Sequence, residues 1–350
     1  MKAEFSFEPG LTTPENDEKF EKIWAQFINK VQDDYRIDLD NQEMLRAHIA
    51  EHHGHVLNLM DIFWKSALDA VNWGSEILHE YLEEGPEDDA RATLFTTLTG
   101  LGSRALLAFS EVSWLLRGGY PHGAFTRVRS LHELFIVAAI LSEYGSPESE
   151  HPDLVNRYRR HHEVFANTTA RDLIATDVPG ITDTLNDGVL DKLDTRKKEL
   201  IATYGKKFAT TWGWAAPLFP NEFPSFIGLN RLVMPSLTAY YGIASEHVHA
   251  SSAGLIDAGE PDEAGAMGFN GGPSTEDLGF PAILAATFLL AVVGAIVPVE
   301  IHDPKTGKKI DTGRRMLEVL ARLHQEILNA WDKKPAESDS GDAESAEEGS

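Results

Sequence analysis

The chain has 350 residues, of which 42% are apolar, and its 55 acidic and 31 basic side chains give a formal net charge of −24. A surface this acidic repels phosphate backbones, so binding of nucleic acid or of anionic membranes through bulk charge is not expected. The lack of cysteine excludes disulfides, thiolate metal sites and cysteine nucleophiles. The first ten residues contain no apolar run of the kind that a secretory signal needs, so a cytoplasmic protein is expected.

Six helices are predicted in the first 204 residues. Thr13-Pro14 is a typical helix start, and Asp40 with Glu43 resembles a capping box. Gly85-Pro86 and Gly118-Gly119 are the expected stops of the second and third helices, and a break is expected near 72–74. The segment 176–190 is rich in Gly, Pro and Asp and is expected to be irregular. The predicted helices are 14–34, 40–84, 87–117, 124–144, 153–175 and 191–204.

The second part of the chain begins with an aromatic, proline-rich segment, 206–230, which is expected to be a packed loop with short helical turns. A helix is predicted from Pro235 to about Leu255, followed by a surface loop over 256–272. The segment 299–310 contains two strand-like runs around a turn, which predicts a small β-hairpin. Thr312 is the expected cap of a last amphipathic helix, and the acidic tail 333–350 is expected to be disordered.

One apolar stretch, Leu278–Val299, has no charge over 22 residues and is long enough to span a bilayer. No Lys, Arg, Trp or Tyr stands close to either end as a membrane anchor, and Pro281 and Pro298 bracket the apolar core of the segment. A helix buried on all sides is therefore favoured over a membrane span, with Ser274 or Thr275 as its cap.

These elements predict an all-α protein, an irregular multi-helix bundle with a long N-terminal helical hairpin and one small β-hairpin near 299–310. The expected organisation is an N-terminal helical region (1–90) that packs on the core, a main helical domain (91–332) and the tail (333–350). A homo-oligomer is compatible with this reading.

Polar side chains follow one face of the helix predicted after Pro235. At 100° per residue, Tyr241, Ser245 and Ser252 fall on one stripe, with His249 at its edge. Because polar groups at core positions need partners, other helices are expected to supply them. The apolar helix 124–144 carries Arg127, Arg129 and Glu133, which are the natural candidates. The alternative is a structural network that fixes packing and binds nothing.

Arg127 and His132 have the R-x4-H spacing used by HEPN-type RNases, in which an arginine and a histidine act on the RNA phosphate and 2′-hydroxyl. The spacing has little specificity, because histidines cluster in this chain and Val128 replaces the polar residue that usually follows the arginine. A Ser-His-acid triad from Ser245, His249 and Glu246 fails because Glu246 points about 100° away from the other two. No phosphate-binding or dinucleotide-binding fingerprint is found.

A metal site is a weaker hypothesis. His48, His52 and His55, with Glu51, lie within one face of a helix, although the H-E-x-x-H motif is absent. His52 projects into the apolar stripe there, so one core histidine with partly exposed neighbours is the favoured interpretation. A di-iron bundle needs two Glu-x-x-His motifs, and one is found, at Glu246 and His249. No metal or cofactor is therefore predicted.

Three segments together are similar to the bacterial domain-of-unknown-function family 5677: LLRGGYPHGAFTRVRSLHELFIVAAIL, RYRRHHE and YYGIASEHVHASSAGL, followed by a long apolar helix. Members resemble one another in an R-x5-E motif on one helix and a Y-x3-S-x3-H motif on a later one. The likeness covers about Leu94–Ala295 and implies an all-α bundle with a shared polar site of no established activity. The matching residues are Arg127, Glu133, Tyr241, Ser245 and His249.

Three functional hypotheses follow, and the sequence does not decide whether the protein is an enzyme. The first is a polar pocket formed by Arg127, Arg129, Glu133, Tyr241, Ser245 and His249 that binds a small anionic or nucleotide-like ligand. The second is an RNase or nucleotide-processing enzyme of HEPN type, with His249 or His132 as general base and Arg127 on the phosphate. The third is a scaffold without chemistry.

Overall fold

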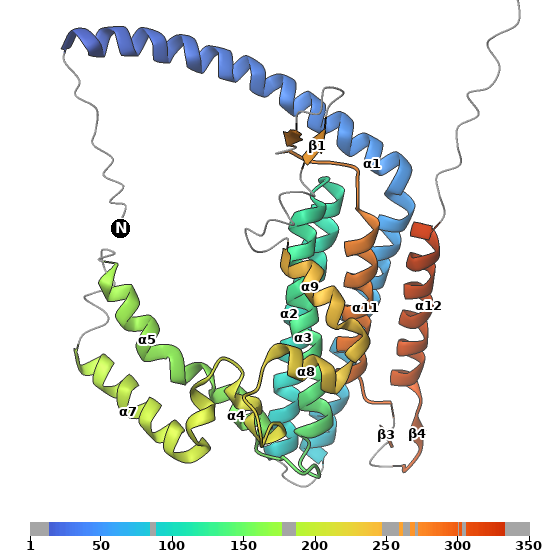
Figure 1. The fold of residues 1–350 in the computed structure, drawn as a ribbon. Helices are drawn as coiled ribbons and strands as arrows, with labels where there is room; N and C mark the ends of the chain where they lie inside the picture. Colours follow the sequence, from blue (N-terminus) through green and yellow to red (C-terminus); the bar gives the residue numbers. More distant parts are fainter. Residues whose placement is uncertain are drawn as a thin grey trace, which may run out of the picture.

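The computed structural model describes residues 14–84, 89–176, 187–246, 259–261, 267–269, 272–299, 301–302 and 306–332. Within these ranges the chain is dominated by helices, with two short two-stranded β-ladders. The predicted all-α class is confirmed. The helices α2, α3 and α11 lie side by side in the centre of the bundle, with α12 outside them (Figure 1).

Helix α1 (Pro14–Glu84) is one uninterrupted helix, so the two helices predicted at 14–34 and 40–84 and the break expected near 72–74 are wrong. No glycine or proline occurs between residues 15 and 53, so the backbone has no breaker there, and Asp40 lies inside the helix rather than at a cap. Gly74 continues the helix, buried against Pro298 and Val297. The long N-terminal hairpin is formed by α1 and α2.

The core of the bundle is built on α2 (Asp89–Arg117), α3 (Pro121–Tyr144) and α11 (Gly279–Ile296), against which α1 and α12 (Thr312–Asp332) pack. Phe63 of α1 meets Phe109 of α2, with 5.6 Å between their ring centroids. The turn between α2 and α3 contains Gly119 at φ +77°, a conformation that side chains other than glycine rarely adopt. The predicted stop at Gly118-Gly119 is confirmed.

Helix α11 is long and apolar enough to cross a membrane by length and composition. In the bundle it is surrounded by α1, α2, α3 and α12 (Figure 1). Phe288, Leu289 and Val292 are 0 to 1% exposed. A helix that is apolar around its whole circumference is stable in water when neighbouring helices cover it, and here they do.

The middle of the chain consists of shorter helical pieces. The predicted helix 153–175 is divided at His161 into α4 (Leu154–Arg160) and α5 (His162–Ala175), where the ladder tightens to bonds between residues three apart, Tyr158 to His161 and His161 to Val164. The segment 206–230 forms short helical turns, as predicted. The remaining elements are α7 (Asp187–Tyr204), η1 (Lys206–Ala209), η2 (Gly213–Leu218), α8 (Phe226–Val233), η3 (Pro235–Leu237) and α9 (Thr238–Glu246).

The predicted β-hairpin near 299–310 is confirmed: β3 (Ile301–His302) pairs antiparallel with β4 (Lys309–Ile310), directly before α12. The segment 256–272, predicted as a loop, contains a second pair of strands: β1 (Gly259–Pro261) pairs antiparallel with β2 (Met267–Phe269). Three residues of glycine-rich strand carry too little alternation of apolar and polar residues for the pattern to show in the sequence. The tail 333–350 lies outside the described residues.

Candidate functional site

The helices α3 and α9 bring together three polar side chains, Arg129, Glu133 and Tyr241, which we call the Arg129 cluster. Arg129 Nη2 donates a hydrogen bond of 2.9 Å to Tyr241 Oη, and the guanidinium carbon lies 5.0 Å from the centroid of the tyrosine ring. Glu133 Oε1 lies 3.4 Å from both Arg129 Nε and Tyr241 Oη. The Arg129 side chain is 20% exposed and that of Glu133 is 36% exposed, so the cluster lies at the edge of the core and is still in contact with solvent.

A second polar group, which is fully buried, lies beside this cluster. His132, 1% exposed, shares a 2.8 Å hydrogen bond between its Nε2 and Asn230 Oδ1. Asn230 Nδ2 donates to Thr238 Oγ1 at 2.7 Å, which assigns Oδ1 as the acceptor and Nε2 of the histidine as the donor. The imidazole stacks on Phe288 at 4.5 Å. Burial lowers the pKa of His132 to about 4, so the ring is neutral at neutral pH.

Aromatic rings connect the two groups. The Tyr241 ring lies 4.2 Å from that of Phe226 and 5.9 Å from the imidazole of His132. Phe226 begins α8, where Ser225 caps the helix by accepting a hydrogen bond from the backbone N–H of Gly228. The Arg129 cluster therefore rests on an apolar aromatic floor that keeps water away from its inner side.

The structure separates Arg127 from this cluster. Arg127 and Arg129 are about 200° apart around the axis of α3, so they project to opposite sides of the helix. Arg127 Nε pairs with Glu111 Oε2 of α2 at 2.8 Å, and its side chain is 46% exposed. The R-x4-H pair also diverges, because His132 is enclosed in the core while Arg127 faces solvent, and His132 has no position from which to act as a general base.

Two further residues of the predicted site are not placed. Ser245 belongs to α9, one turn after Tyr241. Its side chain, and the whole of His249, lie outside the described residues.

The histidines of α1 do not form a metal site in the described part of the chain, where no group of three or more His, Asp or Glu side chains is placed to hold an ion. His48 and His52 have ring centroids 4.1 Å apart, but His52 is exposed and does not project into the core as predicted. The partly buried histidine is His53, which stacks on Trp331 of α12 at 5.0 Å. The prediction was wrong because Trp331 of α12 packs on His53 and leaves its neighbour His52 exposed.

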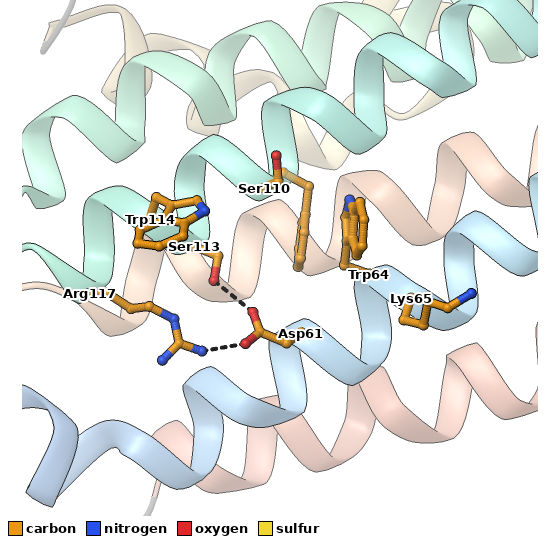
Figure 2. A pocket seen from close by; sticks show the side chains of 8 residues that line it. Asp61, Trp64, Lys65, Ser110, Ser113, Trp114 and Arg117 are labelled. Carbon is orange, nitrogen blue, oxygen red and sulfur yellow. Dashed lines mark hydrogen bonds and ion pairs between the residues drawn. The ribbon is translucent and has the colours of Figure 1, made fainter.

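A pocket of about 480 Å³ that the sequence did not indicate lies between α1 and α2 (Figure 2). Asp61 accepts hydrogen bonds from Arg117 Nη2 at 2.6 Å and from Ser113 Oγ at 3.2 Å. Trp64 Nε1 donates to the carbonyl of Leu106 at 3.0 Å, whereas the Trp114 ring is 75% exposed. The polar groups of this pocket are thus paired with one another, as are those of the Arg129 cluster. The residues lining it are Asp61, Trp64, Lys65, Phe109, Ser110, Ser113, Trp114 and Arg117.

The fold and the site define a helical bundle whose apolar central helix, α3, carries a partly exposed Arg–Glu–Tyr cluster together with the following α9. Residues 95–266, which include both helices, match the family model described as "Family of unknown function (DUF5677)". This match confirms the resemblance that was stated from the sequence. No curated protein and no solved structure is significantly similar to the chain.

Proposed function

We propose that the Arg129 cluster binds a small anionic, nucleotide-like ligand. The observation that supports this proposal is that Tyr241 and Glu133 hold the Arg129 guanidinium in place while part of it remains open to solvent. A positioned guanidinium is well suited to a carboxylate or phosphate, because it offers several N–H donors in a fixed plane.

Glu133 narrows the chemistry of the ligand. A carboxylate beside the arginine repels a simple anion such as inorganic phosphate, but it accepts hydrogen bonds from hydroxyl groups. A ligand with an acidic group for Arg129 and hydroxyl donors for Glu133 satisfies both, and a nucleoside monophosphate has both. In this proposal Ser245, which follows Tyr241 on α9, and His249 contact the same ligand, and the protein is cytoplasmic.

The enzyme alternative, a HEPN-type RNase or nucleotide-processing activity, now depends on His249 alone. His132 is buried and neutral, and Arg127 is on the other side of α3. The scaffold alternative treats the Arg129 cluster as a structural network. A ligand test separates binding from scaffolding.

The test is a thermal-shift panel with inorganic phosphate, adenosine and the four common nucleoside monophosphates. We expect at least one monophosphate to raise the melting temperature of the wild type, by an amount equivalent to about 2.7 kcal/mol at a hundredfold excess over its Kd. Phosphate and adenosine alone should have smaller effects. A wild type that responds to no monophosphate would exclude the proposal.

The chain offers a matched control within one helix. Arg129→Gln should abolish the shift, whereas Arg127→Gln, which also removes a guanidinium paired with a glutamate of the bundle, should leave it unchanged. Tyr241→Phe removes only the phenolic hydroxyl, and it replaces Arg129→Gln in this test if that variant folds poorly. A ligand shift that survives both Arg129→Gln and Tyr241→Phe would place the ligand elsewhere.

A further inference from the structure

The N-terminal part of α1 extends away from the bundle (Figure 1). Large apolar side chains on this part of the helix are exposed to solvent. We call residues 14–44 of α1 the arm. Phe20, Trp24 and Phe27 are 47 to 56% exposed, and Val31 and Tyr35 continue the same face at 41 and 58%. The rings of Phe20, Trp24 and Phe27 stack on one another along the helix, with centroids 6.2 and 5.9 Å apart.

This apolar face continues the face that α1 buries in the core. At 100° per residue, Phe20, Trp24, Phe27 and Val31 lie within about 60° of one another around the axis. Ile49, Val56, Met60 and Phe63, each 0 to 4% exposed, fall in the same sector. The arm therefore presents the kind of apolar surface that α1 buries further along the helix. No segment in the described part of the same chain covers this surface.

A second copy of the chain is the occupant that the arm fits. The helix has no glycine or proline from residue 15 to residue 53 at which the arm could fold back onto its own bundle. An anionic membrane is a poor fit, because the arm, residues 14–44, carries nine acidic and four basic side chains. The spacing of the apolar residues along the arm, in contrast, allows the arms of two copies to pack against each other.

We propose that two copies of the protein associate through their arms as an antiparallel helix pair, with the two-fold axis between Phe27 and Ile28. In this pair Phe20 lies opposite the partner's Tyr35 and Trp24 opposite the partner's Val31, while Phe27, next to the axis, meets the partner's Phe27. Each large apolar residue of this face thus meets another, as an isologous interface requires.

The position of the bundle selects the antiparallel arrangement. The bundle lies on the same side of α1 as the apolar face of the arm, so in a parallel pair the two bundles would occupy the same space. In the antiparallel pair they lie at opposite ends. The partner's Pro14 then lies opposite Asn41, before Ile49, the first buried residue of α1.

The area is sufficient for a specific dimer. A large side chain about half exposed has roughly 100 Å² left to bury, so the arms of two copies together bury on the order of 1,000 Å². That is the lower limit of specific interfaces, and a reversible dimer in the micromolar range is expected.

Sedimentation of the full chain over a micromolar concentration series tests the association. The wild type should form a dimer, and Phe27→Asp should raise the dissociation constant about a hundredfold or more, because it places a charge at the centre of both arms. Ile37→Asp is the matched control: Ile37 is 59% exposed on the same arm but lies about 120° away from the apolar face. A monomeric wild type, or equal dimerisation of wild type and Phe27→Asp, would overturn the proposal.

Cross-linking tests the geometry, and the lack of native cysteines makes each introduced thiol unique. Phe27→Cys should form a disulfide-linked dimer, whereas Phe20→Cys alone should not. A mixture of Phe20→Cys and Tyr35→Cys should cross-link. A disulfide formed by Phe20→Cys alone would indicate a parallel pair, and binding of vesicles by a monomeric chain would indicate a membrane surface; either result contradicts the proposal.

Discussion

Lowering the pH should destabilise the fold through His132 more than through any exposed histidine. The pKa of His132 falls from an ordinary 6.5 to about 4 because the ring is buried, with Asn230 as its hydrogen-bond partner and Phe288 stacked on it. Between these two values the unfolded chain takes up a proton that the folded chain does not. The stability that the neutral ring provides is therefore complete above about pH 6.5 and is lost as the pH falls. Between about pH 7.5 and pH 5 the loss from this residue is about 2 kcal/mol.

Urea unfolding at both pH values, on the wild type and on His132→Gln, measures this contribution. Glutamine keeps an N–H donor for Asn230 and does not titrate, so the free energy of unfolding should fall by about 2 kcal/mol less for the variant than for the wild type. His53, His161 and His324, whose pKa values burial also lowers, are present in both proteins and cancel in the comparison. Equal losses in the two proteins would refute the reasoning.

Two further changes test the packing around the site and the core. Asn230→Ala should lower the free energy of unfolding by about 1–3 kcal/mol, because it leaves the buried His132 N–H without an acceptor; an unchanged urea midpoint would show that the bond contributes little. Gly294→Ala should raise the melting temperature slightly, by the equivalent of about 0.5 kcal/mol, because the added methyl, in the last turn of α11, meets no atom of another described segment within 4 Å. Gly313→Ala should instead lower it by about 1–3 kcal/mol, because its methyl would overlap the Pro298 carbonyl oxygen and lie 2.8 Å from the Trp73 ring; equal melting temperatures for the two variants would contradict this packing.

The sequence was sufficient to predict those elements that depend only on helical periodicity and on helix-breaking residues. The buried nature of α11, the stop at Gly119 and the start of α12 at Thr312 follow from apolar composition, glycine and capping residues. Periodicity also identifies Arg129 and Glu133 as neighbours one turn apart, and the structure shows that pair. The same periodicity places Arg127 on the side of α3 opposite Arg129, so it already argues against one site that contains both arginines.

Other features depend on contacts between distant segments, which a local pattern does not contain. The chain from Tyr35 to Leu39 is predicted as a connection because Asp40 and Glu43 resemble a capping box after it, yet nothing in it stops a helix. Asn230 was not singled out, because its role follows from α8 lying against His132. The groove beside Trp114 likewise exists only after α1 and α2 have packed.

The continuity of α1 has a mechanical consequence. Its inner half is fixed in the core from Ile49 onward, and its outer half continues as the same rod, with no joint between them. At 1.5 Å per residue, Phe20 lies roughly 43 Å along the axis from Ile49, so a tilt of about 10° in the core swings Phe20 by about 7 Å. The helix acts as a lever, and a small repacking among α2, α11 and α12 becomes a large displacement at its far end.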